Sequence, residues 1–150
     1  MDLPLRQKSF PIQVDQPVRI FLVDDSAHFL KVMINLLNSD PRFEVIGIAL
    51  SGREALAQMT QLQPDLVLID VAMPDISGLE LTRHLKRKSD APRVVIMTMY
   101  EEPGYRLAAE LVKADGFVPK AHIAHELPPL IKDLFHPTGP DSPIQYPSTC

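Results

Sequence analysis

The chain has 150 residues, of which 45% are hydrophobic, and this suits one domain with a substantial core. Its formal net charge of −4 does not favour a nucleic-acid surface, so we expect no DNA binding by this chain alone. Its one cysteine, Cys150, excludes an intrachain disulfide, and no signal peptide or stretch of roughly 20 apolar residues is present, so we expect a cytoplasmic protein without membrane contact.

Five short apolar runs, each bounded by polar or turn-forming residues, predict strands that are largely buried. An extended N-terminal arm with three prolines, residues 1–17, is expected before them. The run at residues 66–70 is apolar until its last residue, Asp70, which must emerge at the sheet edge or be compensated there. The predicted strands are residues 18–23, 43–49, 66–70, 93–98 and 115–118.

Helices are predicted between these strands from their starting signals. Three begin with a serine that can cap the first turn, and two of these serines have a glutamate three residues later, as in a capping box. The fourth begins with a proline, which suits a first helical turn. These helices run from Ser26 to about Asn38, from Ser51 to about Gln61, from Ser77 to about Lys88 and from Pro103 to about Lys113.

The last helix contains two prolines, Pro128 and Pro129. Because proline is poorly tolerated in a helix interior, we expect an irregular stretch from Ala121 and a helix that begins late, near Glu126, and ends near Phe135. Residues 136–150 hold four further prolines and no apolar periodicity, so they are interpreted as a disordered tail or a truncated linker.

The alternation of strands and helices over residues 18–135 predicts an α/β fold with a parallel sheet covered on both faces. The length suits a flavodoxin-like, doubly wound (βα)5 domain with five strands in the order 2-1-3-4-5.

Polar side chains follow the apolar runs at one edge of this predicted sheet: Asp24, Asp25, Asp70, Thr98 and Lys120. Each alone has an ordinary explanation, such as a solvated turn or a lysine that reaches water. Together, three clustered carboxylates repel one another and would have raised pKa values unless a cation lies between them, and an oxygen-only site suits Mg²⁺. The lysine and threonine can donate to phosphoryl oxygens. The set therefore suggests transfer of a phosphoryl group to a carboxylate.

With these residues the sequence resembles the response-regulator receiver domain of two-component signalling, and is most similar to the NarL/LuxR-type subfamily. The likeness extends over about residues 18–135. It is carried by Asp24-Asp25, Asp70 with Met73-Pro74 and Gly78, Thr98, and Phe117 with Lys120.

The resemblance implies that Asp70 is the phosphoacceptor. It implies a Mg²⁺ site, with Mn²⁺ as an alternative ion, formed by Asp24, Asp25, Asp70 and the backbone carbonyl of Ala72. Lys120 is implied as a partner of the phosphoryl oxygens.

Thr98 is implied both as a phosphoryl-oxygen partner and as the switch hydroxyl, and Phe117 as the switch aromatic. If Thr98 moves toward the phosphate, Phe117 can enter the space that it leaves. The output surface is expected to include Tyr105, Glu110 and Phe117, and phosphorylation is expected to drive homodimer formation there. Tyr100 is expected to shield the phosphate from water. The alternatives are that its hydroxyl holds the attacking water or that it packs on the surface beside the fourth helix.

The partner implied is a histidine kinase or a histidine phosphotransfer protein. A LuxR-type effector would need a DNA-binding domain after Phe135, so a stand-alone receiver and a piece of a longer regulator both remain open. Two other functions are considered. A phosphorylation-independent interaction module would be favoured by loss of an acid or of Lys120, and none is lost. A phosphohydrolase with Asp70 as nucleophile would need a further base and a substrate cap.

The first helix carries two apolar stripes beside each other. We assign the first stripe to the core: Phe29, Val32, Met33 and Leu36. The second is either part of a broad buried face or an exposed docking patch for the kinase: Leu30, Ile34 and Leu37.

Overall fold

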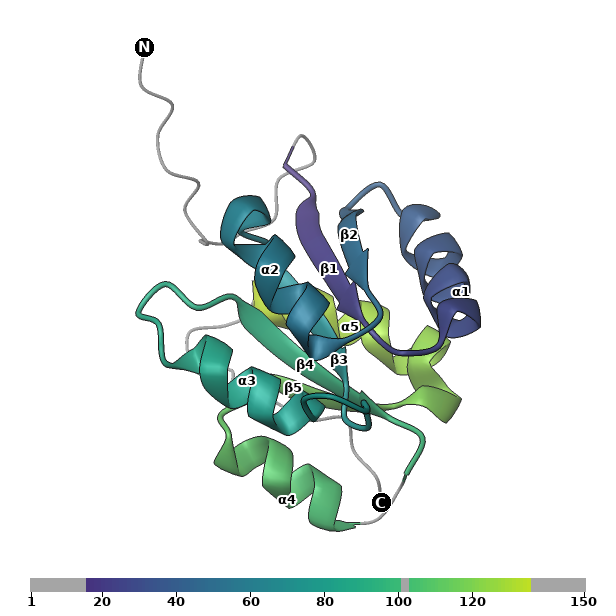
Figure 1. Ribbon diagram of the computed structural model, residues 1–150. Helices are drawn as coiled ribbons and strands as arrows, with labels where there is room; N and C mark the ends of the chain where they lie inside the picture. The colour runs from purple at the N-terminus through teal and green to yellow at the C-terminus, as the bar shows by residue number, and fades with distance from the viewer. Residues whose placement is uncertain (1–15, 101–102, 136–150) are drawn as a thin grey trace.

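The computed structural model describes residues 16–100 and 103–135, and it shows a single five-stranded parallel sheet in the order β2-β1-β3-β4-β5. Residues 1–15 of the expected arm and the expected tail at 136–150 lie outside the described part. The predicted flavodoxin-like order is confirmed (Figure 1). The strands are β1 (Val18–Val23), β2 (Phe43–Ala49), β3 (Leu66–Asp70), β4 (Arg93–Thr98) and β5 (Gly116–Pro119).

The helices follow the strands in strict alternation, as predicted. Their bounds are α1 (Ala27–Asn38), α2 (Gly52–Leu62), α3 (Gly78–Lys86), α4 (Pro103–Leu111) and α5 (Ile123–Phe135), with a 3₁₀ turn η1 (Lys120–His122) before α5. The serine caps are present: the side chains of Ser26, Ser51 and Ser77 accept hydrogen bonds from the backbone N–H three residues later. Among the described residues, no helix is long and apolar enough to cross a membrane.

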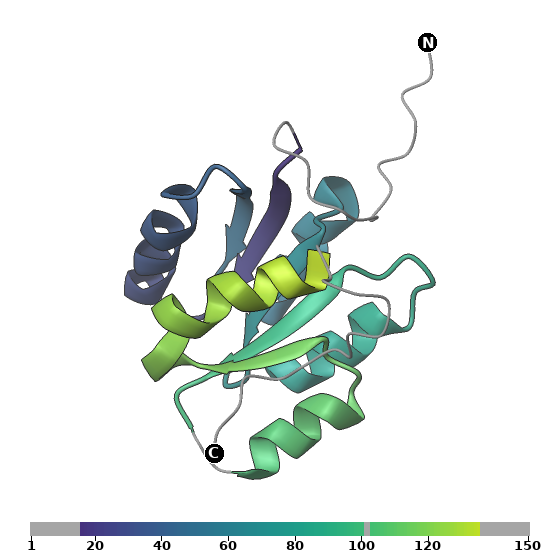
Figure 2. The same cartoon turned by 180° about the vertical axis from the view of Figure 1, so that it is seen from behind.

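The sheet separates two apolar layers. Figure 1 shows α2 and α3 in front of the sheet and α4 at its lower edge beside β5, and Figure 2 shows α1 and α5 on the opposite face. Side chains alternate along each strand, so in β1 Ile20 and Leu22 join the α1–α5 layer, whereas Phe21 and Val23 join the other layer. This alternation decides on which side of the sheet each residue beyond a strand end emerges.

The start of α5 corrects a prediction. The helix begins at Ile123 rather than near Glu126, and both Pro128 and Pro129 lie inside it. These prolines leave the carbonyls of Ala124 and His125 without their usual partners, but both residues are exposed, so water can satisfy them. Burial of the helix's apolar face against the sheet outweighs this local cost. The buried residues are Ile123, Leu127, Leu130, Ile131, Leu134 and Phe135.

Helix α1 corrects part of a second prediction. Its buried face takes residues from both apolar stripes, so the structure supports the broad buried face that we considered and not an exposed docking patch at Leu30 and Leu37. Leu30, Met33 and Leu37 are buried, whereas Val32, assigned to the core from the sequence, is 45% exposed. Phe29 and Leu36 are only partly buried at the margin. Because both stripes are apolar, only packing against the sheet decides that Leu30 turns inward and Val32 outward.

A matched pair of variants tests this orientation of α1. Leu30→Asp places a charge at a site that is 1% exposed, so we expect a loss of about 3–5 kcal/mol in the free energy of unfolding, or failure to fold. Val32→Asp changes an exposed site, so its loss should stay within about 1 kcal/mol. Urea unfolding measures both, and equal losses would contradict the assignment.

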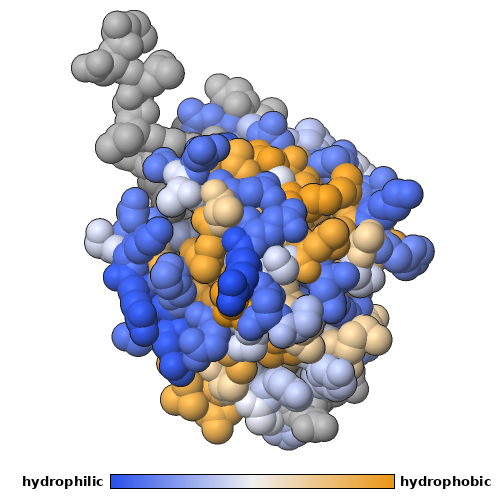
Figure 3. Space-filling model, in the orientation of Figure 1, coloured by the Kyte–Doolittle hydropathy of each residue, from blue (hydrophilic) through white to orange (hydrophobic). Residues whose placement is uncertain are grey.

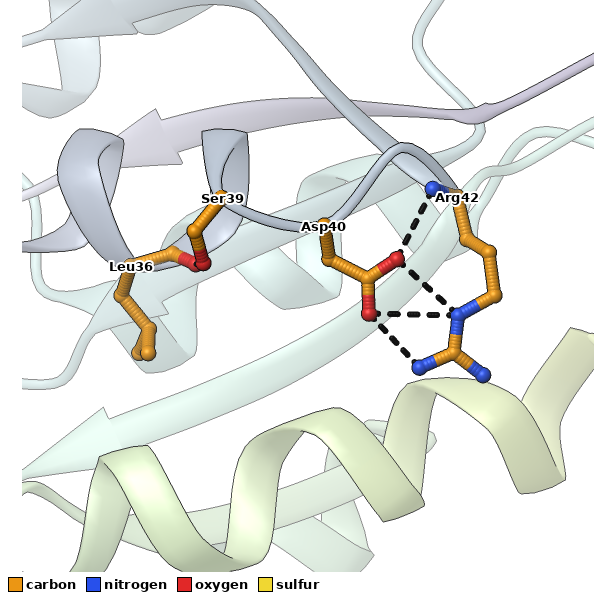
Figure 4. A network of polar contacts seen from close by, with 4 residues as sticks. All are labelled: Leu36, Ser39, Asp40 and Arg42. Carbon is orange, nitrogen blue, oxygen red and sulfur yellow. Dashed lines mark hydrogen bonds and ion pairs between the residues drawn. The ribbon is translucent and has the colours of Figure 1, made fainter.

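The turn from α1 to β2 is held by one side-chain pair. Asp40 Oδ2 lies 2.6 Å from a guanidinium nitrogen of Arg42, and Asp40 Oδ1 accepts the Arg42 backbone N–H at 2.9 Å (Figure 4). Ser39, drawn beside them, donates its hydroxyl to the carbonyl of Leu36 at 2.7 Å. These local bonds fix how the chain leaves α1 and enters the edge strand.

Candidate functional site

Three charged residues meet at the carboxyl edge of the sheet. Asp24 follows β1, Asp70 ends β3, and Lys120 follows β5. Each continues the row of its strand that faces the α1–α5 layer, after Leu22, Leu68 and Val118 respectively. The edge predicted from the sequence therefore does bring these side chains together, and it does so on one face of the sheet.

Lys120 connects the two buried acids. Its Nζ lies 2.6 Å from Asp24 Oδ2 and 3.3 Å from Asp70 Oδ1. The Lys120 side chain is only 8% exposed, and both carboxylates are buried. The ammonium is thus held inside the site rather than extended into water, which was the ordinary explanation for a lone lysine at this position.

The acids also form a set with the composition of a cation site. Asp24, Asp25 and Asp70 each offer a carboxylate oxygen, and these oxygens lie within 4.8 Å of one another. Asp24 Oδ2 is fully buried and accepts no hydrogen bond of regular geometry, and it lies in an ion pair with Lys120. A buried, under-coordinated carboxylate oxygen among hard oxygen donors fits Mg²⁺, and such an acidic triad is typical of a receiver Mg²⁺ site.

Burial raises the pKa of Asp70 to about 6. Lys120 opposes this rise by charge and hydrogen bonding, and the nearby carboxylates of Asp24 and Asp25 add to it. A cation bound among the three acids would favour their ionised forms. Without a cation, keeping all three carboxylates ionised therefore lowers the stability of the folded protein.

This pKa predicts a pH-dependent effect of removing the Asp70 charge. The native value of about 6 lies above the ordinary value of 3.8, so ionised Asp70 weakens the fold above about pH 6 and costs nothing below about pH 4. Without divalent cations, Asp70→Asn should therefore raise the melting temperature at about pH 8 but not at about pH 4. A gain that is the same at both pH values would contradict the assigned pKa.

Thr98 and Phe117 lie on the other side of the sheet edge. Thr98 ends β4 in the row that faces α3 and α4, and its fully buried hydroxyl accepts the backbone N–H of Tyr100 at 2.9 Å. Phe117 is 2% exposed, and the guanidinium of Arg106 on α4 lies 4.9 Å from the centre of its ring. Phe117 is thus turned inward, and its expected place on the output surface is wrong for this structure.

The loop from β3 to α3 approaches Asp70 closely. Gly78 donates its backbone N–H to the carbonyl of Val71 at 3.0 Å, and its Cα lies so near the Asp70 backbone that a side chain has no room. Asp75 in the same loop accepts the backbone N–H groups of Gly52 and Arg53 at 3.2 and 2.9 Å. Ala72 is exposed in this loop, and its carbonyl stays a predicted ligand.

Two contacts in and beside the site were missed by the sequence analysis. The ring of Phe29 lies under Lys120, with Nζ 4.3 Å from its centre, and Arg106 covers Phe117. Neither pair has a sequence signal, because the partners are about ninety and eleven residues apart on different elements. Tyr100 stacks on Tyr105 with ring centres 5.5 Å apart, which favours packing beside α4 over shielding of Asp70.

A cavity of about 610 Å³ opens at the opposite, amino-terminal edge of the sheet, between α2 and α3. Two of its basic residues serve the fold: Arg19 donates to the carbonyls of Leu62 and Gln63, and Lys86 pairs with Asp115 at 2.5 Å. The cavity therefore does not belong to the carboxylate site.

Comparison with known proteins gives a consistent result. The family model described as the response regulator receiver domain matches residues 20–132. The DNA-binding transcriptional activator DevR/DosR of Mycobacterium tuberculosis is 37% identical over 117 residues, which are 78% of this chain and 54% of that protein. A protein-glutamate methylesterase/protein-glutamine glutaminase of Koribacter versatilis is 34% identical over 101 residues, or 67% of this chain and 28% of that protein. The chain thus spans about half or less of these relatives.

Solved structures show the same likeness. The receiver domain of the response regulator NarL from Mycobacterium tuberculosis aligns with a TM-score of 0.74 at 25% identity, covering 79% of this chain and 95% of that chain. A LuxR-family response regulator from Aurantimonas aligns with a TM-score of 0.74 at 30% identity, covering 79% and 85%.

Proposed function

This chain belongs to the response regulator receiver family, and from that premise we propose that it is a signalling switch that accepts a phosphoryl group on Asp70. The observation that carries the proposal is the placement of Lys120, whose ammonium is held between the carboxylates of Asp24 and Asp70 in a buried acidic pocket. The fold does not need this cluster: burial of Asp70 beside two other acids raises its pKa, so the charged arrangement costs stability. A costly cluster of this kind is typical of a functional site.

The proposed reaction transfers a phosphoryl group from a phosphohistidine to Asp70. A carboxylate oxygen of Asp70 forms the new bond to phosphorus as the bond to the donor's imidazole nitrogen breaks, and the imidazole leaves with the electron pair. Lys120 and Thr98 would contact the phosphoryl oxygens. Asp24, Asp25 and Asp70 would hold Mg²⁺, with Ala72 contributing its carbonyl, and the ion would neutralise charge on the phosphoryl oxygens.

The cheapest test uses a small-molecule donor and no partner. Incubated with acetyl phosphate and Mg²⁺, the protein should gain the mass of one phosphoryl group, and excess EDTA should slow this gain by at least tenfold. Mn²⁺ should restore it. Intact-mass spectrometry gives the readout, and a protein that gains no mass under any of these conditions would support the phosphorylation-independent interaction module instead.

We propose that the output lies on α4, β5 and α5. Helix α4 is the least buried helix, with Ala109 as its buried residue, and it exposes Leu107 and Leu111. Figure 3 shows hydrophobic surface at the bottom of the view, where α4 lies. Because Phe117 already faces inward under Arg106, the change on phosphorylation would come through Thr98 and the stacked tyrosines at the start of α4.

The donor proposed is a histidine kinase or a histidine phosphotransfer protein. Its contact surface on α1 would be the outer margin of the helix, where Val32 is exposed and Phe29 and Leu36 are partly exposed. We also propose that phosphorylation drives homodimer formation on the output surface. The likeness to the transcriptional activator DevR/DosR and to the LuxR-family regulator from Aurantimonas supports a role as the receiver part of a LuxR-type regulator.

A further inference from the structure

We propose that Phe29 is a positioning residue for Lys120, so that an aromatic ring on α1 sets the rate at which the site accepts phosphate. The inference rests on the proposed function, because it assigns a rate effect to a lysine that the proposed reaction uses. It adds a residue that is neither acidic nor basic, and that the sequence analysis placed in the core.

The contact itself has the geometry of a cation–π pair. Lys120 Nζ lies 4.3 Å from the centre of the Phe29 ring, inside the roughly 6 Å within which such pairs attract. The Lys120 side chain is 8% exposed, so little water weakens the attraction. The ring supplies an electron-rich face and no hydrogen-bond acceptor. It can therefore hold the ammonium while leaving its three N–H donors free for oxygen atoms.

The backbone that carries this ring is in turn held, through Ser26, by the acid that Lys120 binds. Asp24 Oδ1 accepts the backbone N–H of Ser26 at 2.8 Å, and the Ser26 hydroxyl accepts the backbone N–H of Phe29 at 3.2 Å. Lys120 then closes the circuit by contacting both the Phe29 ring and Asp24 Oδ2. Four residues, two from the loop between β1 and α1, one from α1 and one from η1, thus form a closed circuit of contacts that includes the ammonium.

This circuit of contacts decides what Lys120 can do. Without the aromatic face, the ammonium keeps only its carboxylate partners. The flexible four-carbon side chain of Lys120 can then change conformation with those partners or extend into water. With the aromatic face, the ammonium stays beside Asp70, where the incoming phosphoryl group must bind. Positioning of this kind changes rates strongly, since a misplaced catalytic group loses most of its effect.

The contact can be observed before any chemistry. In the NMR spectrum of the full chain, the ring should shift the Cε-bound hydrogens of Lys120 upfield, and Phe29→Leu should remove this shift. A parent spectrum without the shift, or a variant that retains it, overturns the inference. This reading does not depend on phosphate uptake, so the inference and the proposed function can fail separately.

The rate is then tested with a graded series. Phenylalanines with one, two and three ring fluorines are inserted at position 29, because fluorine weakens the cation–π attraction with little change of shape. The rate of phosphate uptake from acetyl phosphate should fall with each fluorine and by about 3- to 10-fold for Phe29→Leu. A rate that is unchanged or faster along the series overturns the inference.

A matched control separates positioning from general loss of packing. Phe43 also lies beside a cation, with Arg42 at 5.4 Å from its ring centre, but at the start of β2 and away from the acids. Phe43→Leu should lower the melting temperature and leave the rate of uptake unchanged. Equal slowing by Phe43→Leu and Phe29→Leu would overturn a specific role for Phe29, and a parent that takes up no phosphate would overturn the proposed function.

Discussion

Asp70→Asn should abolish phosphate uptake while the protein remains folded. The amide is nearly the same size as the carboxylate, so the packing at the end of β3 is preserved, but it lacks the anionic oxygen that attacks phosphorus. Removing a carboxylate whose pKa is raised to about 6 by burial also relieves a cost in the folded state. Intact-mass spectrometry after treatment with acetyl phosphate and Mg²⁺ should therefore show a protein without added mass.

A control in the same loop makes this result specific. Asp75 is exposed, accepts backbone N–H groups at the start of α2 and is not a member of the cluster of Asp24, Asp25 and Asp70. Asp75→Asn should lower stability slightly and take up one phosphoryl group at the parent's rate. Stoichiometric labelling of Asp70→Asn, or loss of labelling in Asp75→Asn, would place the phosphoacceptor elsewhere.

Gly78→Ala should damage both the fold and the site. A Cβ at this position would overlap the carbonyl oxygen of Asp70 and would lie 2.9 Å from both the Asp70 carbonyl carbon and Ile69 Cγ2. The obstructing atoms are mainly backbone at the end of a central strand, so they cannot turn aside as a flexible side chain could. We expect a loss of about 2–4 kcal/mol in the free energy of unfolding, because overpacked sites relax only by moving the backbone.

The same variant should slow phosphate uptake by at least about tenfold, since the movement falls on the residue that carries the proposed phosphoacceptor. Gly104→Ala is the matched control, because a Cβ there meets nothing within 4 Å at the exposed start of α4. It should be neutral or stabilising by up to about 1 kcal/mol, with unchanged uptake. Urea unfolding and mass spectrometry measure both variants, and similar behaviour of the two would contradict the close approach at Gly78.

The sequence determined the order of elements and the edge at which the site forms. Two kinds of local signal are present in the structure. Apolar runs that end in polar residues form β1 and β3, and serines that accept the backbone N–H three residues later begin α2 and α3. Parallel connectivity then requires the strand ends to meet at one edge. For that reason the sequence alone predicts that Asp24, Asp70 and Lys120 lie in one group.

Tertiary packing decided the orientation of α1 and the start of α5, which the local sequence does not determine by itself. Helix α1 has two apolar stripes, and only the sheet beneath it selects Leu30 over Val32 as the inward residue. Helix α5 begins before its two prolines because its apolar face gains more by burial than the lost backbone bonds cost. The rotation of α1 that buries Leu30 also turns Phe29 under Lys120, a contact between residues about ninety positions apart that no periodicity or spacing encodes.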